Sequence, residues 1–205
     1  MASRFLYLLR HGEAAEDGEL TARGEQQARL TGERLREVPL SAIYCSPQSR
    51  AARTAEIVAG YVHGVAPAES ELIDDYIPSD PDLAGLPADY ARFVSAYDPA
   101  ERAAGAELSR AAAEKFGGPG DTAVTGQDEH VLLVTHNFQI GWFVRAALAA
   151  PEWRWLGLNQ QNCALTVLMY RSGLPPSLVS FNDAGHLTRP LRWTGFPDGL
   201  RPAAG

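Results

Sequence analysis

The sequence predicts an α/β fold, a three-layer α/β/α sandwich with a mostly parallel sheet, one antiparallel edge and a helical insertion. Strand-like and helix-like segments alternate over residues 1–62, which is typical of parallel strands joined by right-handed crossovers. Near the C-terminus a short connection joins two strand-like runs, which indicates an antiparallel pair. A length of 205 residues with 45% hydrophobic residues fits a single domain with a sizeable core, residues 1–205.

The first strand is expected over residues 4–9, which are mostly apolar at both alternate sets of positions and end before His11. Thr21 is a suitable N-cap for the next helix, which is expected to run to Val38, where Pro39 stops it. These two elements form the opening half of a parallel crossover.

A second short strand is expected over residues 42–45. Ser46 and Pro47 fit the N-cap and the first position of the helix that follows. Its inward face carries apolar residues at helical spacing: Ala51, Ala55, Val58, Ala59 and Val62.

Residues 78–128 differ from the rest of the chain because they are rich in proline, aspartate, alanine and glycine. An apolar stripe at helical spacing lies inside them: Tyr90, Phe93, Val94 and Tyr97. The segment is too short to bury a core of its own, so we interpret it as a helical insertion and a candidate lid. The stripe fits a core position or a dimer face equally well, so the sequence leaves the oligomeric state open.

The strongest strand signal covers residues 130–135, and a helix is expected over residues 137–149. Residues 164–170 and 177–182 are the two strands of the expected antiparallel pair. The tail, residues 192–205, is rich in proline and glycine and is expected to be irregular.

Polar residues collect directly after three of the expected strands. The three groups are Arg10-His11-Gly12, Ser46 to Arg50, and Thr135-His136-Asn137. The carboxyl ends of parallel strands meet at one edge of an open sheet, where ligands bind. We therefore expect two arginines and two histidines to face one crevice.

These residue types suit phosphoryl transfer. The guanidinium groups of Arg10 and Arg50 can hold phosphate oxygens in bidentate fashion and stay charged at any working pH. A neutral imidazole such as that of His11 can attack phosphorus and form a covalent intermediate. Gly12 would let a phosphate approach the backbone, because it has no side chain.

Four motifs occur in order along the chain, and a fifth segment follows near its end. They are Arg10-His11-Gly12, Leu20-Thr21-Ala22-Arg23-Gly24-Glu25-Gln26-Gln27-Ala28, Ser46-Pro47-Gln48-Ser49-Arg50-Ala51-Ala52-Arg53-Thr54-Ala55, Val134-Thr135-His136 and Asn182-Asp183-Ala184-Gly185-His186-Leu187. Arg-His-Gly alone is a weak signal, whereas four ordered motifs in the expected strand and helix context are specific. Together they resemble the histidine phosphatase superfamily, in its phosphoglycerate mutase-like branch, over most of the chain.

The resemblance implies a role for each matching residue. His11 corresponds to the nucleophile that becomes phosphohistidine, and Arg10 and Arg50 to the arginines that hold the phosphate. His136 corresponds to the second pocket histidine, which contacts the transferring group.

The family's general acid is usually a carboxylate that follows a leucine between the second and third of these strand ends. Here the segment is Glu71-Leu72-Ile73-Asp74-Asp75-Tyr76, without the more usual glutamate. By spacing Asp74 matches best and Asp75 next, and the possibility that neither fills the role stays open.

The loop after the first motif is short, because only residues 12–20 separate His11 from Thr21. The mutases of the family carry a long loop there, with a Trp-Asn pair that this chain lacks. We therefore expect net hydrolysis of a phosphomonoester or a phosphohistidine. A phosphoglycerate mutase and a non-catalytic phosphate-binding domain are the alternatives.

Composition limits the partners and the location. The formal net charge of −7 argues against binding nucleic acid or an anionic membrane. The expected partner is a small phosphorylated substrate or a phosphoprotein. No cofactor fingerprint or metal-ligand spacing occurs, so we expect neither a cofactor nor a metal. Without a recognisable targeting or membrane-spanning segment, and with two cysteines that fit buried thiols, a cytoplasmic protein is expected.

Overall fold

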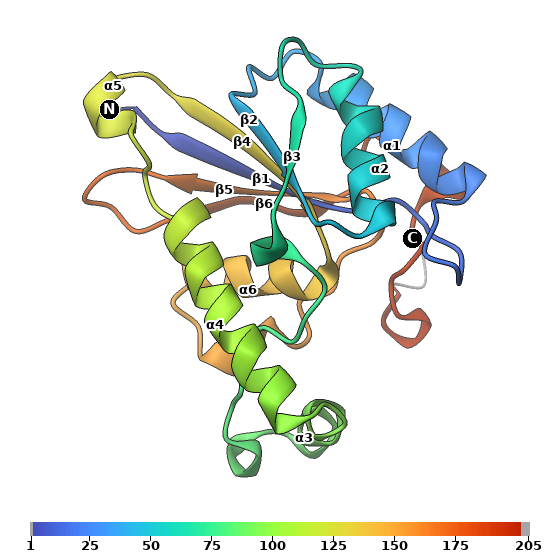
Figure 1. The fold of residues 1–205 in the computed structure, drawn as a ribbon, viewed down its shortest axis with the longest axis vertical. Coiled ribbons are helices and arrows are strands. Elements are labelled where there is room, and N and C mark those ends of the chain that lie inside the picture. Colours follow the sequence, from blue (N-terminus) through green and yellow to red (C-terminus); the bar gives the residue numbers. More distant parts are fainter. Residues whose placement is uncertain (1, 202–205) are drawn as a thin grey trace.

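The protein is an α/β sandwich whose sheet carries helices on both faces (Figure 1). The computed structural model describes residues 2–201. Within them the sheet has six strands in the order β3-β2-β4-β1-β5-β6. The strands are β1 (Arg4–Arg10), β2 (Ala42–Cys45), β3 (Pro67–Glu69), β4 (Glu129–Thr135), β5 (Leu165–Tyr170) and β6 (Ser177–Asp183).

Strand directions confirm the predicted mixed sheet. Strands β3, β2, β4 and β1 run parallel, whereas β5 is antiparallel to β1 and pairs antiparallel with β6. The edge strand β3 was not expected from the sequence, because it has three residues, begins at Pro67 and has no apolar pattern.

Six α-helices lie within the described residues. They are α1 (Ala22–Leu35), α2 (Ser49–Ala59), α3 (Ala88–Ser95), α4 (Pro99–Phe116), α5 (Thr122–Thr125) and α6 (Asn137–Ala147). Helices α1 and α2 cover one face of the sheet, and α4 and α6 cover the other (Figure 1). Alternate residues of β1 reach the two layers: Leu9 packs with α1 and α2, and Leu6 and Leu8 pack with α4 and α6.

Thr21 caps α1 as predicted, because its side chain accepts a hydrogen bond from the Gly24 amide. The helix ends at Leu35, however, before the predicted end at Val38. Helix α6 likewise ends at Ala147, before the predicted Ala149, which has a positive φ of 51° and so cannot continue the helix.

The predicted start of α2 was wrong. Its N-cap is Gln48, in an extended conformation, and not Ser46. The Ser46 hydroxyl binds Asp74 and His136 and accepts from the Gln48 amide, and residues 47–48 form a bend before the helix begins. Arg50 still falls in the first turn of the helix.

The segment 78–128 contains α3, α4 and α5, which confirms its helical nature. Val94 of the apolar stripe is fully buried, and it packs in a separate core cluster with Ile77, Trp142 and Trp155. The insertion is therefore joined to α6 and to the short 3₁₀ helix Glu152–Trp155. Its action as a lid stays a prediction.

No helix within residues 2–201 has the length and apolar composition needed to cross a membrane.

Candidate active site

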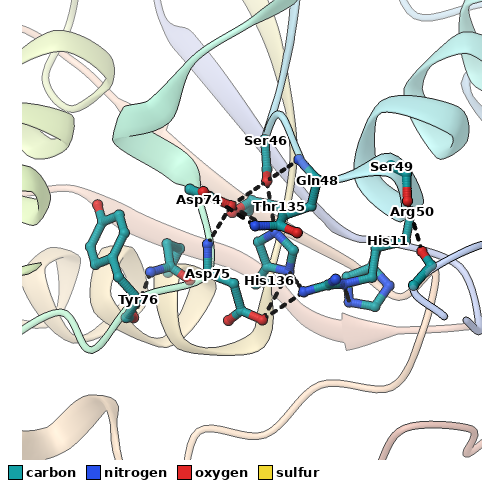
Figure 2. Close-up of polar contacts among 12 residues, drawn as sticks. His11, Ser46, Gln48, Ser49, Arg50, Asp74, Asp75, Tyr76, Thr135 and His136 are labelled. Carbon is teal, nitrogen blue, oxygen red and sulfur yellow. Dashed lines mark hydrogen bonds and ion pairs between the residues drawn. The ribbon is translucent and has the colours of Figure 1, made fainter. Parts of the chain in front are cut away.

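The ends of β1, β2 and β4 bring the predicted polar groups together. Arg10 pairs with Thr135 in the register of β1 and β4, and the His11 amide donates to the Thr135 carbonyl at 3.0 Å. The Ser46 amide donates to the Val134 carbonyl at 3.0 Å, so the third strand end lies beside the other two. The two histidine rings are 5.1 Å apart between centroids. The crevice expected from the sequence thus exists, and Figure 2 shows its polar contacts.

His11 is buried and its ring is held in one tautomer. Its Nδ1 lies 2.8 Å from the Gly12 carbonyl, which only accepts, so Nδ1 carries the proton. The Nε2 atom therefore keeps a lone pair, and it accepts from Arg50 Nε at 3.3 Å. Burial, followed by His136 and Arg10, lowers the pKa of His11 well below its usual 6.5. At neutral pH the imidazole is uncharged.

His136 is held in the opposite tautomer. The single proton of the Ser46 hydroxyl goes to Asp74 Oδ1 at 2.8 Å, because a carboxylate only accepts. The contact of 2.8 Å between Ser46 Oγ and His136 Nε2 is therefore donated by the histidine. The lone pair of His136 Nδ1 faces Arg50 Nη2 at 3.4 Å. Burial, and then Arg50, lowers the pKa of His136 to about 3.

Arg10 carries a positive charge without a carboxylate partner among the described residues. Its Nη1 donates to the carbonyls of Gln160 at 2.6 Å and Gly195 at 2.7 Å, which are neutral. Its buried Nε has no hydrogen-bond partner in residues 2–201. Burial lowers the pKa of Arg10 to about 10, so it stays charged at neutral pH. A guanidinium that is held by neutral carbonyls and has no hydrogen-bonded carboxylate favours an anion beside it.

Arg50 links the members of the site. Its guanidinium contacts both histidine rings and forms an ion pair of 2.8 Å with Asp75 (Figure 2). Its side chain is 19% exposed, so a ligand can still reach it. Arg10 and Arg50 together supply two positive charges around the His11 ring.

The two candidate acids have different surroundings. Asp74 binds the Ser46 hydroxyl and the Asp75 amide, both at 2.8 Å through Oδ1, and does not line the main cavity. Asp75 lines that cavity with Arg10, His11 and His136. Burial raises the pKa of the Asp75 carboxyl group, and the Arg50 contact opposes the rise. Asp75 is therefore the carboxyl group that faces the site.

Hydrogen bonds from two elements hold the loop that carries Asp75 in place. The Thr135 hydroxyl at the end of β4 donates to the Ile73 carbonyl at 2.6 Å, and the side-chain amide of Gln139 on α6 donates to the Tyr76 carbonyl at 2.9 Å. The carboxyl group of Asp75 thus has a defined place relative to the two histidines.

Two cavities meet at Arg10, His11 and Gly195. The larger has a volume of about 680 Å³ and extends toward α3, α6 and the residues after Trp155. The smaller, about 300 Å³, opens beside the loop 13–18 and Arg50. The larger volume is typical of a small-molecule site.

Gly12 has a packing role at this site, and its predicted contact with phosphate stays a prediction. Its amide donates to Thr54 Oγ1 at 3.0 Å and its carbonyl accepts from His11 Nδ1 at 2.8 Å. A Cβ atom here would lie 2.7 Å from the Gly24 carbonyl oxygen at the start of α1. Gly12 is required by the close approach of α1, and it lines neither of the two cavities.

Several residues of the site were not anticipated. The sequence predicts Ser46 as a helix cap within the second polar group and not as a partner of His136, and the carbonyls of Gln160 and Gly195 that hold Arg10 carry no side-chain signal at all. Gly195 also belongs to the tail that was expected to be irregular. A polar run before β5, residues 159–162, is the one sequence feature that could have drawn attention to this region.

Within the described chain, no group of three or more histidine, cysteine, aspartate or glutamate side chains is arranged to hold a metal ion.

The sandwich, with Arg10 and His11 at the end of its first strand and His136 at the end of β4, defines the class of histidine phosphatases. The sequence model of the histidine phosphatase superfamily (branch 1) matches residues 6–184, and the chain belongs to this family.

Curated relatives include a serine/threonine-protein phosphatase Pgam5, mitochondrial, of Caenorhabditis briggsae, 31% identical over 91% of this chain and 65% of the relative. A probable phosphoglycerate mutase GpmB of Salmonella choleraesuis is 26% identical over 90% of this chain and 95% of the relative. The chain thus spans about two thirds of the length of the Pgam5 relative. That relative is named as mitochondrial, and the cytoplasmic location expected here stays a prediction.

Solved structures support the fold. A phosphoserine phosphatase variant from Entamoeba histolytica, in complex with phosphoserine, has a TM-score of 0.66 at 24% identity and covers 90% of this chain and all of that one. YhfR of Bacillus stearothermophilus has a TM-score of 0.67 at 23% identity, over 89% and 98% of the two chains.

Proposed function

We propose that the protein is a metal-independent phosphatase that hydrolyses phosphomonoesters through a covalent phosphohistidine on His11. The observation that carries this proposal is the state of His11. Its Nε2 lone pair faces Arg50, its Nδ1 proton is held by the Gly12 carbonyl, and burial keeps the ring uncharged. A fixed, uncharged imidazole between two guanidinium groups is suited to attack a phosphate dianion.

In the first half-reaction the Nε2 lone pair attacks phosphorus and the bond to the leaving oxygen breaks. The leaving oxygen takes the proton of the Asp75 carboxyl group. The raised pKa of Asp75 supports this role, and a bound phosphate dianion would raise it further. Arg10 and Arg50 neutralise the charge of the transferring group.

In the second half-reaction water attacks phosphorus and gives a proton to the Asp75 carboxylate. The phosphorus–nitrogen bond breaks, which releases inorganic phosphate and returns neutral His11. The cycle needs no redox partner and no metal. Asp75, rather than Asp74, is the proposed general acid because only Asp75 lines the cavity with His11.

The decisive experiment measures hydrolysis of 4-nitrophenyl phosphate in the presence of a chelator. We expect turnover in the wild type and a loss of about a thousandfold or more in His11→Ala. Quenching in alkali should trap acid-labile, base-stable phosphate on the wild type and none on His11→Ala. The matched control is His63→Ala, since His63 is exposed and outside both cavities; it should leave turnover unchanged.

Full activity of His11→Ala would overturn the assignment of the nucleophile. Phosphate binding by calorimetry without turnover of any phosphomonoester would favour a non-catalytic domain. Isomerisation of a phosphoglycerate that depends on a bisphosphorylated primer would favour a mutase.

A further inference from the structure

The larger cavity has a wall of aromatic side chains beyond the reacting groups. This aromatic wall consists of Tyr90, Phe93, Tyr97, Phe138 and Trp155. Three of its members come from the insertion, at α3 and just after it, whereas Phe138 lies on α6 and Trp155 in the 3₁₀ helix that follows. The insertion therefore contributes directly to the surface that a leaving group would meet.

The rings of the aromatic wall hold one another in place. Phe93 is at the centre, with ring centroids 5.5 Å from Tyr97, 5.8 Å from Phe138 and 6.5 Å from Trp155. Phe138 and Trp155 are 5.0 Å apart. These are the distances of favourable edge-to-face and tilted pairs, so the wall is formed before a ligand binds.

A purely structural role does not account for Phe93. Its neighbour on α3, Val94, is fully buried and joins the insertion to the core, but Phe93 remains 37% exposed and lines the cavity. An exposed aromatic surface of this kind, continuous with reacting groups, is typical of a ligand site.

The charged residues that line the two cavities disfavour a leaving group that carries a negative charge. Among described lining residues, the only arginines or lysines are Arg10 and Arg50, which belong to the phosphate end. The acidic lining residues are Asp75 and Glu101 in the larger cavity and Glu13 and Glu16 in the smaller one. A carboxylate on the leaving group would thus meet negative charge and find no further cation.

The electrostatic potential around the Tyr97 hydroxyl group is consistent with the acidic lining of the larger cavity. Burial raises the pKa of its hydroxyl group, and the charges of Asp75 and Glu101 raise it further. The outer part of the larger cavity is therefore both apolar and negative in potential.

Resting on the phosphatase function proposed above, we propose that the larger cavity selects phosphomonoesters whose leaving alcohol carries an aromatic or bulky apolar group and no negative charge. The aromatic wall would cover that group, and Glu101 would act against anionic alternatives such as phosphoglycerates.

The test compares three substrates that all release an alkoxide, so that the intrinsic reactivity of the leaving group stays similar. We expect kcat/KM to be roughly tenfold higher for 2-phenylethyl phosphate than for ethyl phosphate, because the phenyl ring is buried on the wall. 3-Phosphoglycerate should fall below ethyl phosphate. Equal values for the first two, or 3-phosphoglycerate as the best substrate, would overturn the proposal.

Two pairs of variants locate the effect. Phe93→Ala should lower kcat/KM roughly tenfold for 2-phenylethyl phosphate and leave ethyl phosphate unchanged. Phe181→Ala is its matched control, since Phe181 is also 37% exposed but lies on β6, outside the cavity. Glu101→Gln should raise kcat/KM for 3-phosphoglycerate about threefold, and Glu107→Gln on the same helix should not.

Binding of two phosphonates separates this proposal from the proposed function. 2-Phenylethylphosphonate should bind the wild type roughly tenfold more tightly than ethylphosphonate, by calorimetry, whether or not turnover occurs. Turnover of ethyl phosphate without this preference would refute the substrate class and leave the phosphatase intact. The preference without turnover of any substrate would refute the phosphatase instead.

Discussion

Two adjacent aspartates have distinct tasks at the residue scale. Asp74 binds Ser46 and thereby acts on His136, whereas Asp75 faces the cavity and contacts Arg50. The chain bends at residues 74–76, and the two side chains there have different partners. Adjacent residues of one type can therefore be assigned separate roles.

Asp75→Asn removes the proposed proton donor. We expect kcat/KM to fall about 100-fold for 2-phenylethyl phosphate, whose alkoxide needs a proton, and less than about tenfold for 4-nitrophenyl phosphate, whose nitrophenolate leaves without one. Steady-state kinetics with both substrates measures the difference.

Asp74→Asn is the matched control, because it removes the same charge one residue away. It should affect both substrates to a similar extent. A loss with Asp75→Asn that does not depend on the leaving group would speak against proton donation by Asp75.

Ser46 is a positioning residue that acts through His136. In Ser46→Ala the His136 Nε2 proton loses its acceptor, so the ring can adopt the other tautomer, and kcat should fall about tenfold. Nitrogen NMR of the ring should show protonation at Nε2 in the wild type and a mixture in the variant. Ser49→Ala is the control, since Ser49 binds the Gly18 carbonyl instead. An unchanged tautomer in Ser46→Ala would contradict this role.

At the scale of elements, α4 packs unusually close to the loop that carries Asp75. A Cβ atom on Gly105 would overlap the Ile77 carbonyl oxygen. The insertion therefore does more than line the cavity, because its longest helix also packs against the segment that follows Asp75.

Gly105→Ala tests this contact. Alanine normally stabilises a helix by about 1 kcal/mol relative to glycine, but here we expect a net loss of about 1–3 kcal/mol in the free energy of unfolding. The value of kcat should fall too, because the Asp75 loop must move. Urea unfolding and steady-state kinetics measure the two effects.

The control for that variant is Ala104→Gly, at an exposed neighbouring position of α4. It should cost about 1 kcal/mol of stability with kcat unchanged. A Gly105→Ala variant more stable than the wild type would show that the close packing is unimportant.

For the whole molecule, the net charge of −7 is compatible with the proposed phosphate site. Many of the arginines pair with carboxylates on the surface, as Arg34 does with Asp183 at 2.6 Å and Arg29 with Glu25 at 2.7 Å. Arg10 differs because neutral carbonyls hold it. One local excess of positive charge is thus maintained within an acidic protein.

Stability should fall as the pH is lowered from 7 to 5. Folding depresses the pKa of four histidines: His11 well below 6.5, His136 to about 3, His186 to about 4 and His130 below 6.5. Below pH 6.5 the unfolded chain therefore binds protons that the folded chain does not, and each histidine contributes a slope of up to about 1.4 kcal/mol per pH unit. The raised pKa of Asp75 acts in the opposite direction.

Urea unfolding at pH 7, 6 and 5 measures the slope. His186→Gln, outside the site, should reduce it, since glutamine does not titrate and can still donate to the Thr31 hydroxyl. A slope equal to that of the wild type would exclude His186 as a contributor.

The sequence by itself determined five of the six strands, most helices and the strand ends that carry the chemistry. Apolar runs mark β1 and β4 because both are buried on two faces, and the polar residues that follow them could be recognised next to those runs. Arg10, His11, Arg50 and His136 were found in this way. Such signals are local, so they can be read along the chain.

The tertiary structure alone decided which carboxyl group faces the cavity, what holds Arg10 and where α2 begins. The carbonyls that bind Arg10 come from residues 150 and 185 positions away, and Ser46 meets a histidine 90 positions away. Backbone carbonyls are the same in every residue, and a hydroxyl group can cap a helix or bind a distant ring. Only the packing of remote segments selects between these uses, which is why the sequence placed Ser46 incorrectly.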